Sequence, residues 1–137
     1  MGCQIRLLML FGTLISFASV VLSKQGTSVY YARPYLPSAC YGNRNQGIMI
    51  AGANPTLYNG GKVCGRRYKV RCLGGTNKTP HPCKSGEITV KVVDLCPGCG
   101  ANEINLSQDA FSRIANLKAG RVRIDYIQYA NLKFLVH

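Results

Sequence analysis

The chain of 137 residues contains no tryptophan, only two histidines and only five acidic residues. The absence of tryptophan counts against a carbohydrate-binding surface. His81 and His137 lie too far apart in the sequence to propose a zinc site, so we expect no metal and no cofactor. Repeats, low-complexity segments and nucleic-acid-binding motifs are also missing. These absences exclude a repeat architecture and give no support to base recognition.

The N-terminus has the pattern of a secretory signal peptide. Arg6 precedes an apolar run over residues 7–22 that small and hydroxylic residues interrupt. An uncleaved membrane anchor is the alternative, but it requires about 20 apolar residues and this run is shorter. We therefore predict a signal peptide over residues 1–23, and one extracellular domain over residues 24–137 without stable membrane insertion.

The cysteines indicate a domain stabilised by disulfides. Cys3 is removed with the signal peptide, and an even set remains: Cys40, Cys64, Cys72, Cys83, Cys96 and Cys99. In a short secreted chain this set predicts three disulfides, for which 15 connectivities are possible. The Cys96-Pro97-Gly98-Cys99 spacing also occurs in redox pairs and metal sites, but its place after a strand favours a structural bridge.

The charge of the predicted mature chain is strongly positive. Without Arg6, 16 of the 17 Lys and Arg residues remain, against five acids. Such a chain attracts acidic polymers, and outside a cell these are acidic polysaccharides or membrane headgroups rather than nucleic acid. The alternative is a generally basic surface that serves solubility.

Alternating apolar residues predict several short strands. The predicted strands cover residues 26–31, 66–72, 88–95 and 122–126, and the tail over residues 132–136 is a candidate edge strand. One helix is predicted after Ser107, which suits the N-cap, with Asp109 in its first turn and Gly120 as its stop. The pattern favours a mostly-β barrel or sandwich with one short helix.

Four separated motifs resemble one known family. They read Ala39-Cys40-Tyr41-Gly42, Cys64-Gly65-Arg66-Arg67-Tyr68, Val92-Val93-Asp94-Leu95-Cys96 and Ile104-Asn105-Leu106-Ser107, and Ala110-Phe111 and Ile114-Ala115 follow in the helix. They resemble the expansin N-terminal domain, and most of all the plant natriuretic peptide-like proteins, over essentially the whole mature chain. The resemblance implies a six-stranded double-psi β-barrel with a groove across one face. It also implies the disulfides Cys40–Cys64, Cys72–Cys83 and Cys96–Cys99.

The resemblance also indicates that the chain is not an enzyme. Glycoside hydrolysis normally requires two carboxylates, and the hydrolytic relatives of this barrel carry them where this chain has Asn105 and Arg33. An amide cannot donate a proton as a carboxylic acid does. Asp94 is either a carboxylate of the groove or a strand-end residue that accepts backbone N–H bonds. The other four acids, Glu87, Glu103, Asp109 and Asp125, are expected in caps or on the surface.

Three functions remain open from the sequence. The resemblance implies a secreted signalling monomer in the extracellular space of a plant (the apoplast), which regulates water and solute homeostasis through a cell-surface receptor. The segment 34–70 would carry that activity, with Tyr41, Arg66, Arg67 and Tyr68 as candidate contacts unless the tyrosines fill the barrel. The alternative is a wall-loosening or wall-binding protein whose partner is an acidic wall polysaccharide or a glucan.

For that alternative, the groove candidates are Tyr30, Tyr31, Asp94 and Asn105. A glycoside hydrolase or lytic transglycosylase is the least favoured function. Asn77-Lys78-Thr79 is a glycosylation sequon in a predicted loop, so Asn77 is a candidate for modification. Asn105-Leu106-Ser107 is a second sequon, but a glycan there would fill the groove, so we expect it to be unmodified.

Overall fold

The computed structural model describes residues 23–129, which form six strands and two short α-helices. The strands are β1 (Lys24–Tyr31), β2 (Ile50–Ala53), β3 (Arg67–Gly75), β4 (Glu87–Leu95), β5 (Glu103–Ser107) and β6 (Val122–Gln128). The helices are α1 (Pro55–Tyr58) and α2 (Gln108–Ile114), and the 3₁₀ turns Asn59–Gly61 and Leu117–Ala119 follow them. Residues 1–22 of the expected signal peptide and the candidate edge strand over residues 132–136 lie outside the described residues.

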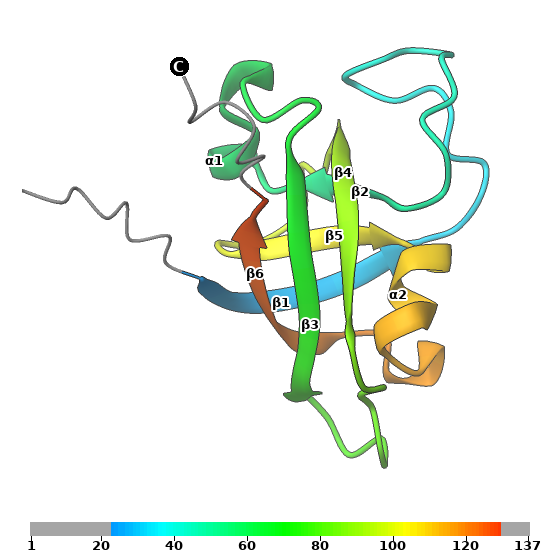
Figure 1. Ribbon diagram of the computed structural model, residues 1–137, viewed down its shortest axis with the longest axis vertical. Coiled ribbons are helices and arrows are strands. Elements are labelled where there is room, and N and C mark those ends of the chain that lie inside the picture. Colours follow the sequence, from blue (N-terminus) through cyan, green and yellow to red (C-terminus); the bar gives the residue numbers. More distant parts are fainter. Residues whose placement is uncertain (1–22, 130–137) are drawn as a thin grey trace, which may run out of the picture.

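The six strands close into a barrel in the order β1-β5-β2-β4-β3-β6. The β1–β5 and β2–β4 pairs are parallel, and the other four pairs are antiparallel. Figure 1 shows the long strands β3 and β4 side by side, with β1 and β5 passing behind them and α2 beside the barrel. The prediction of a mostly-β, six-stranded barrel is confirmed. No helix within residues 23–129 is long and apolar enough to cross a membrane.

The predicted alternation explains how β3 sits in the wall of the barrel. Tyr68 and Val70 are buried, whereas Arg67 and Arg71 on either side of them are exposed and Lys69 between them is half-buried. The strand predicted over residues 26–31 is also present and begins two residues earlier, at Lys24. In both strands successive side chains point to opposite sides of the barrel wall, but in β1 the buried position is the polar Ser28 rather than Val29.

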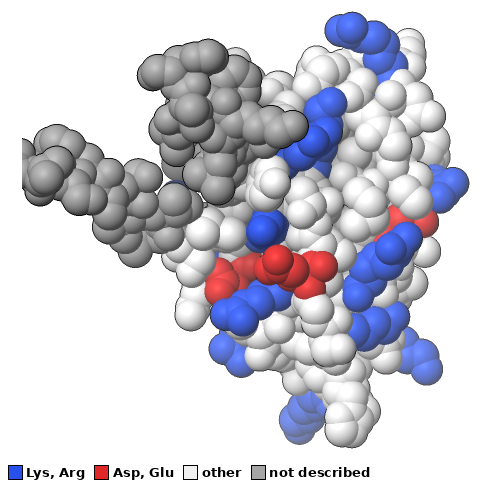
Figure 2. Space-filling view, in the orientation of Figure 1, with Lys and Arg blue, Asp and Glu red and all other residues white. Residues whose placement is uncertain are grey.

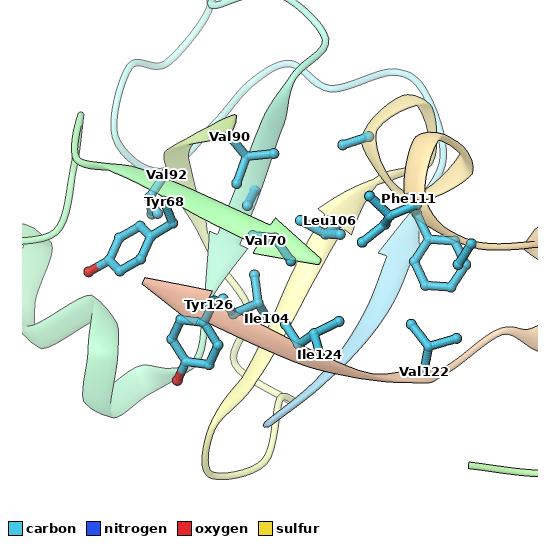
Figure 3. Packing of buried hydrophobic residues seen from close by; sticks show 14 of the residues in the cluster. Tyr68, Val70, Val90, Val92, Ile104, Leu106, Phe111, Val122, Ile124 and Tyr126 are labelled. Carbon is cyan, nitrogen blue, oxygen red and sulfur yellow. The ribbon is translucent and has the colours of Figure 1, made fainter. Parts of the chain in front are cut away.

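The barrel interior holds one continuous apolar core. Figure 3 shows its members from five strands and α2, with Phe111 at one end of the cluster and Tyr68 beside Tyr126 at the other. The rings of Tyr68 and Tyr126 lie 6.1 Å apart. The Phe111 side chain has no exposed surface, so α2 closes its end of the barrel with a fully buried ring.

The predicted helix is present but ends earlier than expected. Ser107 caps it, because its hydroxyl oxygen accepts a hydrogen bond of 3.1 Å from the amide of Ala110. The helix ends at Ile114, not at Gly120, because Ala115 is extended and pairs with Cys83 in an isolated β-bridge. Gly120 ends the following 3₁₀ turn instead, with φ of 70°, which glycine adopts readily.

The three disulfides are Cys40–Cys64, Cys72–Cys83 and Cys96–Cys99, as the family resemblance implied. Cys40–Cys64 joins the segment after β1 to the segment before β3. Cys72–Cys83 joins β3 to the loop that follows it, and Cys96–Cys99 closes the turn after β4. Cys96 and Cys99 are bonded to each other, so neither has a free thiol to bind a metal in this form.

Candidate functional site

Four adjacent strands place one row of residues across the outside of the barrel. Gly52 on β2 pairs with Asp94 on β4 and with Asn105 on β5, and Asn105 in turn pairs with Val29 on β1. Directly paired residues point to the same side of a sheet. This side is the outer one, because Ile104 and Leu106, which flank Asn105, are buried in the core. We refer to Val29, Tyr31, Gly52, Asp94 and Asn105 as the row face.

Gly52 lies at the centre of the row face, between Asp94 and Asn105. It is buried and carries no side chain, and an added Cβ would lie 3.6 Å from the carbonyl oxygen of Asp94. No side chain therefore separates the neighbouring carboxylate from the amide. No local pattern predicted this role of Gly52, because the glycine stands in a short apolar run without alternation.

Tyr31 borders the same face two residues after Val29. Its hydroxyl group and the Oδ1 atom of Asn105 are buried side-chain atoms without a hydrogen-bond partner among the described residues. Burial, and then the negative charges of Asp94 and Tyr35, raise the pKa of the Tyr31 phenol well above its usual range. Tyr31 is therefore a neutral hydrogen-bond donor at any physiological pH.

The Asp94 carboxylate has the turn-stabilising contacts that are typical of a strand-end aspartate. Its Oδ1 atom accepts hydrogen bonds of 2.9 Å from the backbone amides of Ala39 and Leu95. These bonds fix the side chain at the end of β4, in register with Gly52. The two alternatives from the sequence are thus compatible, because one carboxylate both supports the turn and lies on the row face.

A second acid near the row face is held in an ion pair. The carboxylate of Asp109 accepts a hydrogen bond of 2.6 Å from the Tyr35 hydroxyl and lies 3.1 Å from the Arg33 guanidinium. The Tyr35 and Arg33 hydrogen bonds lower the pKa of Asp109 below its usual range. Arg33, which stands where the resemblance places a catalytic carboxylate, therefore neutralises a carboxylate, and Asp109 stays ionised.

A cavity of about 200 Å³ lies beside this cluster. Its lining includes Tyr35, Ile48, Ile50 and Val93, and it separates the segment after β1 from the segment before β2. Tyr35 connects the cavity to the row face, because its ring lies 5.3 Å from the ring of Tyr31 in an edge-on arrangement. The cavity was not predicted, and Tyr35 was expected only as part of the signalling segment 34–70.

Tyr30 does not lie on the row face. Its ring packs against Phe111 at 4.8 Å, and its hydroxyl donates a hydrogen bond of 3.2 Å to the carbonyl of Leu117. The expectation that both Tyr30 and Tyr31 face the groove is wrong for Tyr30, because successive strand residues point to opposite sides. The expectation that Glu103 lies in a cap or on the surface is also wrong, because it is buried and accepts hydrogen bonds from Thr27 and Arg121.

The signalling candidates divide between the core and the surface. Tyr68 is 6% exposed and belongs to the core, whereas Arg66 and Arg67 are exposed. Tyr41 is half-buried over Gly65, whose φ of 85° suits glycine and whose added Cβ would lie 2.7 Å from the Tyr41 hydroxyl. The structure thus gathers three of the four near the Cys40–Cys64 bridge and places Tyr68 inside the barrel.

The two sequons differ in their surroundings. Asn77 is exposed after β3, and its Nδ2 atom donates a hydrogen bond of 2.9 Å to the carbonyl of Ala119. Asn105 lies half-buried within β5. Between residues 23 and 129 there is no cluster of His, Cys, Asp and Glu that could hold a metal ion.

Comparisons with known proteins agree with this fold. The family model described as "Lytic transglycolase" matches residues 50–126. An "EG45-like domain containing protein" of Citrus jambhiri is 50% identical over 113 residues, which cover 81% of this chain and 86% of the relative. The crystal structure of apo Clavibacter michiganensis expansin superposes with a TM-score of 0.65 at 21% identity, over 80% of this chain and 52% of that chain.

A second crystal structure shares this fold. It is a mutant of the same expansin in complex with cellohexaose, with a TM-score of 0.63 at 23% identity, and it covers 80% of this chain and 52% of that chain. This chain therefore spans about half the length of the bacterial expansin. The three disulfides, the closed barrel of six strands and these matches agree on a double-psi β-barrel. The chain belongs to the EG45-like domain proteins, an expansin-like group of the double-psi β-barrel family.

Proposed function

We propose that this protein is a secreted, non-hydrolytic protein of the plant cell wall that binds a β-glucan chain along the row face. The observation that carries the proposal is the row Asp94, Gly52 and Asn105, with Tyr31 beside it. A row in which no side chain separates a carboxylate from an amide, with an aromatic ring beside it, suits a sugar chain, whose hydroxyl groups both donate and accept hydrogen bonds.

The two unpartnered atoms support a hydroxyl-bearing ligand. A buried polar atom without a partner costs about 1–3 kcal/mol, so a ligand that supplies the missing bond gains affinity. The Tyr31 phenol can donate and Asn105 Oδ1 can accept, and because both atoms are buried in the free protein, a sugar hydroxyl reaches them when the two side chains turn toward the ligand. The expansin complex with cellohexaose supports a glucan as the class of ligand.

The same geometry argues against hydrolysis. A glycosidase needs one carboxyl group that donates a proton and a second that activates water or attacks the sugar. On the row face Asp94 is the sole carboxylate among the described residues, and Asn105 cannot donate a proton as an acid does. Asp109 cannot replace the proton donor, because Tyr35 and Arg33 keep it ionised.

Tyr31→Ala is expected to weaken the affinity for cellohexaose about tenfold, because it removes both the ring and the donor at the row face. Isothermal titration of the oxidised protein measures the affinity, and the same solutions are assayed for released reducing ends. Tyr129→Ala is the matched control, since Tyr129 is 44% exposed and packs beside Lys69. Equal losses in the two variants, or release of reducing ends by the wild type, would contradict the proposal.

A second candidate function is extracellular signalling in water and solute homeostasis through a cell-surface receptor. It is favoured by the exposed Arg66 and Arg67 and the half-buried Tyr41 within the segment 34–70. If this function holds, the folded protein should change the volume of protoplasts, which have no wall, and Arg66→Gln/Arg67→Gln should reduce that response. A response that requires the wall would instead favour the polysaccharide-binding function.

A further inference from the structure

Two positive charges face each other on the outside of the β3–β4 pair. Arg67 on β3 pairs directly with Lys91 on β4 in the antiparallel register. Like charges at directly opposite positions destabilise a sheet. This pair therefore has a cost for the free protein that an anion between the two side chains would remove.

Farther along the same face, cations are neutralised by acids. Lys69 lies 3.8 Å from Glu87, and Arg71 lies 3.0 Å from Asp125. Within the described part of the chain, neither Arg67 nor Lys91 has an acidic partner of this kind. Figure 2 agrees: acidic side chains appear over the middle of this face, and none is visible on its upper part, where β3 begins and β4 ends.

Neighbouring contacts hold Lys91 in place instead of neutralising it. The Lys91 ammonium group donates a hydrogen bond to the side-chain oxygen of Gln46 and lies 4.7 Å from the centre of the Tyr41 ring. The Arg44 guanidinium lies 5.9 Å from the same ring. Three cations thus gather at one end of the β3–β4 face, with one of them fixed by an amide and an aromatic ring.

The opposed pair lines a hollow of about 390 Å³. Its other lining residues include Gln46, Ile48, Met49 and Thr89, and none of its lining residues is acidic. The volume lies within the range of about 300–1,000 Å³ that is typical of small-molecule sites. The lining offers the guanidinium of Arg67, the ammonium of Lys91, a hydroxyl and an amide, next to Ile48, which is 39% exposed. This combination of charged, polar and apolar groups suits a sugar ring that carries a carboxylate.

We infer that this Arg67–Lys91 hollow binds a uronate unit of an acidic polysaccharide, at a site separate from the row face. The planar guanidinium group of Arg67 contacts the carboxylate, and Lys91 supplies the second positive charge. Lys91 is half-buried in the hollow and Arg67 is exposed at it, and a hollow of this size favours one sugar unit of a chain over the flat surface of a membrane. The hollow shares no residue with the row face, so this inference does not depend on the proposed glucan site.

Arg67→Gln/Lys91→Gln is expected to weaken binding to polygalacturonate at least tenfold, because both charged contacts are lost. Arg113→Gln/Lys118→Gln removes the same net charge from exposed positions elsewhere and should change the affinity less than about twofold. Titration at about 0.15 M salt measures both variants against polygalacturonate, its methyl-esterified form and vesicles that contain phosphatidylserine.

Three results would overturn the inference: equal weakening in both double variants, equal affinity of the wild type for the esterified polymer, or a loss confined to the vesicles. Undetectable binding of polygalacturonate by the wild type would also overturn it.

Thermal melting confirms that the variants are folded, and Arg67→Gln alone should raise the melting temperature because it relieves the repulsion. Tyr31→Ala should keep the wild-type affinity for polygalacturonate, so failure of the glucan site is distinguished from failure of this one.

Discussion

Phe111→Ala is expected to lower the free energy of unfolding by about 3–5 kcal/mol, the largest effect of any single substitution considered for this barrel. The Phe111 ring is completely buried and packs against Tyr30 at 4.8 Å. It also attaches α2 to the barrel wall, because α2 contacts β1, β4 and β5. Its removal therefore leaves a cavity where the helix meets three strands. Denaturant unfolding of the oxidised protein, followed by tyrosine fluorescence, measures the loss.

The matched control lies on the same helix. Arg113 is exposed in the last turn of α2, so Arg113→Ala should change the free energy of unfolding by about 0.5 kcal/mol or less. A loss for Phe111→Ala that is no larger than that of the control would show that α2 does not close the core. The difference between the two variants thus isolates packing from helix propensity.

Strands in which apolar and polar residues alternate were predictable from the sequence, because apolar residues at every second position show which side of the strand faces the core. Tyr68 and Val70 on β3 illustrate this, and so do Ile124 and Tyr126 on β6. β2 was not predicted, since all four of its residues, Ile50–Ala53, are buried and show no alternation. It lies between β5 and β4 in the barrel wall, and its Ala51 and Ala53 belong to the core. A strand of this kind cannot be distinguished from any other short apolar run.

The candidate site was partly predictable, and the limit has a physical reason. Asp94 and Asn105 were identified from motifs, but their positions on either side of Gly52 follow from the pairing of β2 with β4 and β5. Strand pairing between residues more than 40 positions apart leaves no local signal in the chain. Tyr30 and Tyr31 show the opposite case, because the alternation of side chains along β1 already implied that only one of them could face outward.

The row face and the Arg67–Lys91 hollow differ in the charge of their side chains. The row face has neutral groups and one carboxylate that is already hydrogen-bonded, and its Tyr31 phenol stays protonated because burial and Asp94 raise the pKa of Tyr31. The hollow has two cations without an acidic partner among residues 23–129. A wall contains both neutral and acidic chains, so the two proposed sites would together let one barrel contact both at once.

Loss of the Cys40–Cys64 bridge is the second large effect that we expect. Replacing both cysteines with serine should lower the free energy of unfolding by about 3.5 kcal/mol, because the bridge closes a loop with a sequence separation of 24. The bridge also holds the segment that supports the row face: the amide of Cys40 donates to the carbonyl of Val93, and the amide of Ala39 donates to Asp94. The variant should therefore also bind cellohexaose more weakly, as titration below its melting temperature would show.

The matched control is the short bridge Cys96–Cys99, whose sequence separation is 3. By the same loop-closure reasoning its removal should cost about 2 kcal/mol. Cys96 and Cys99 lie in the turn just after Asp94 and Leu95, so the two variants compare a long-range constraint with a local one at the same end of β4. If both double variants lost equal stability, loop closure would not be the dominant effect. If only the Cys96–Cys99 variant lost affinity for the glucan, the turn after β4, and not the segment at Ala39, would fix the Asp94 carboxylate.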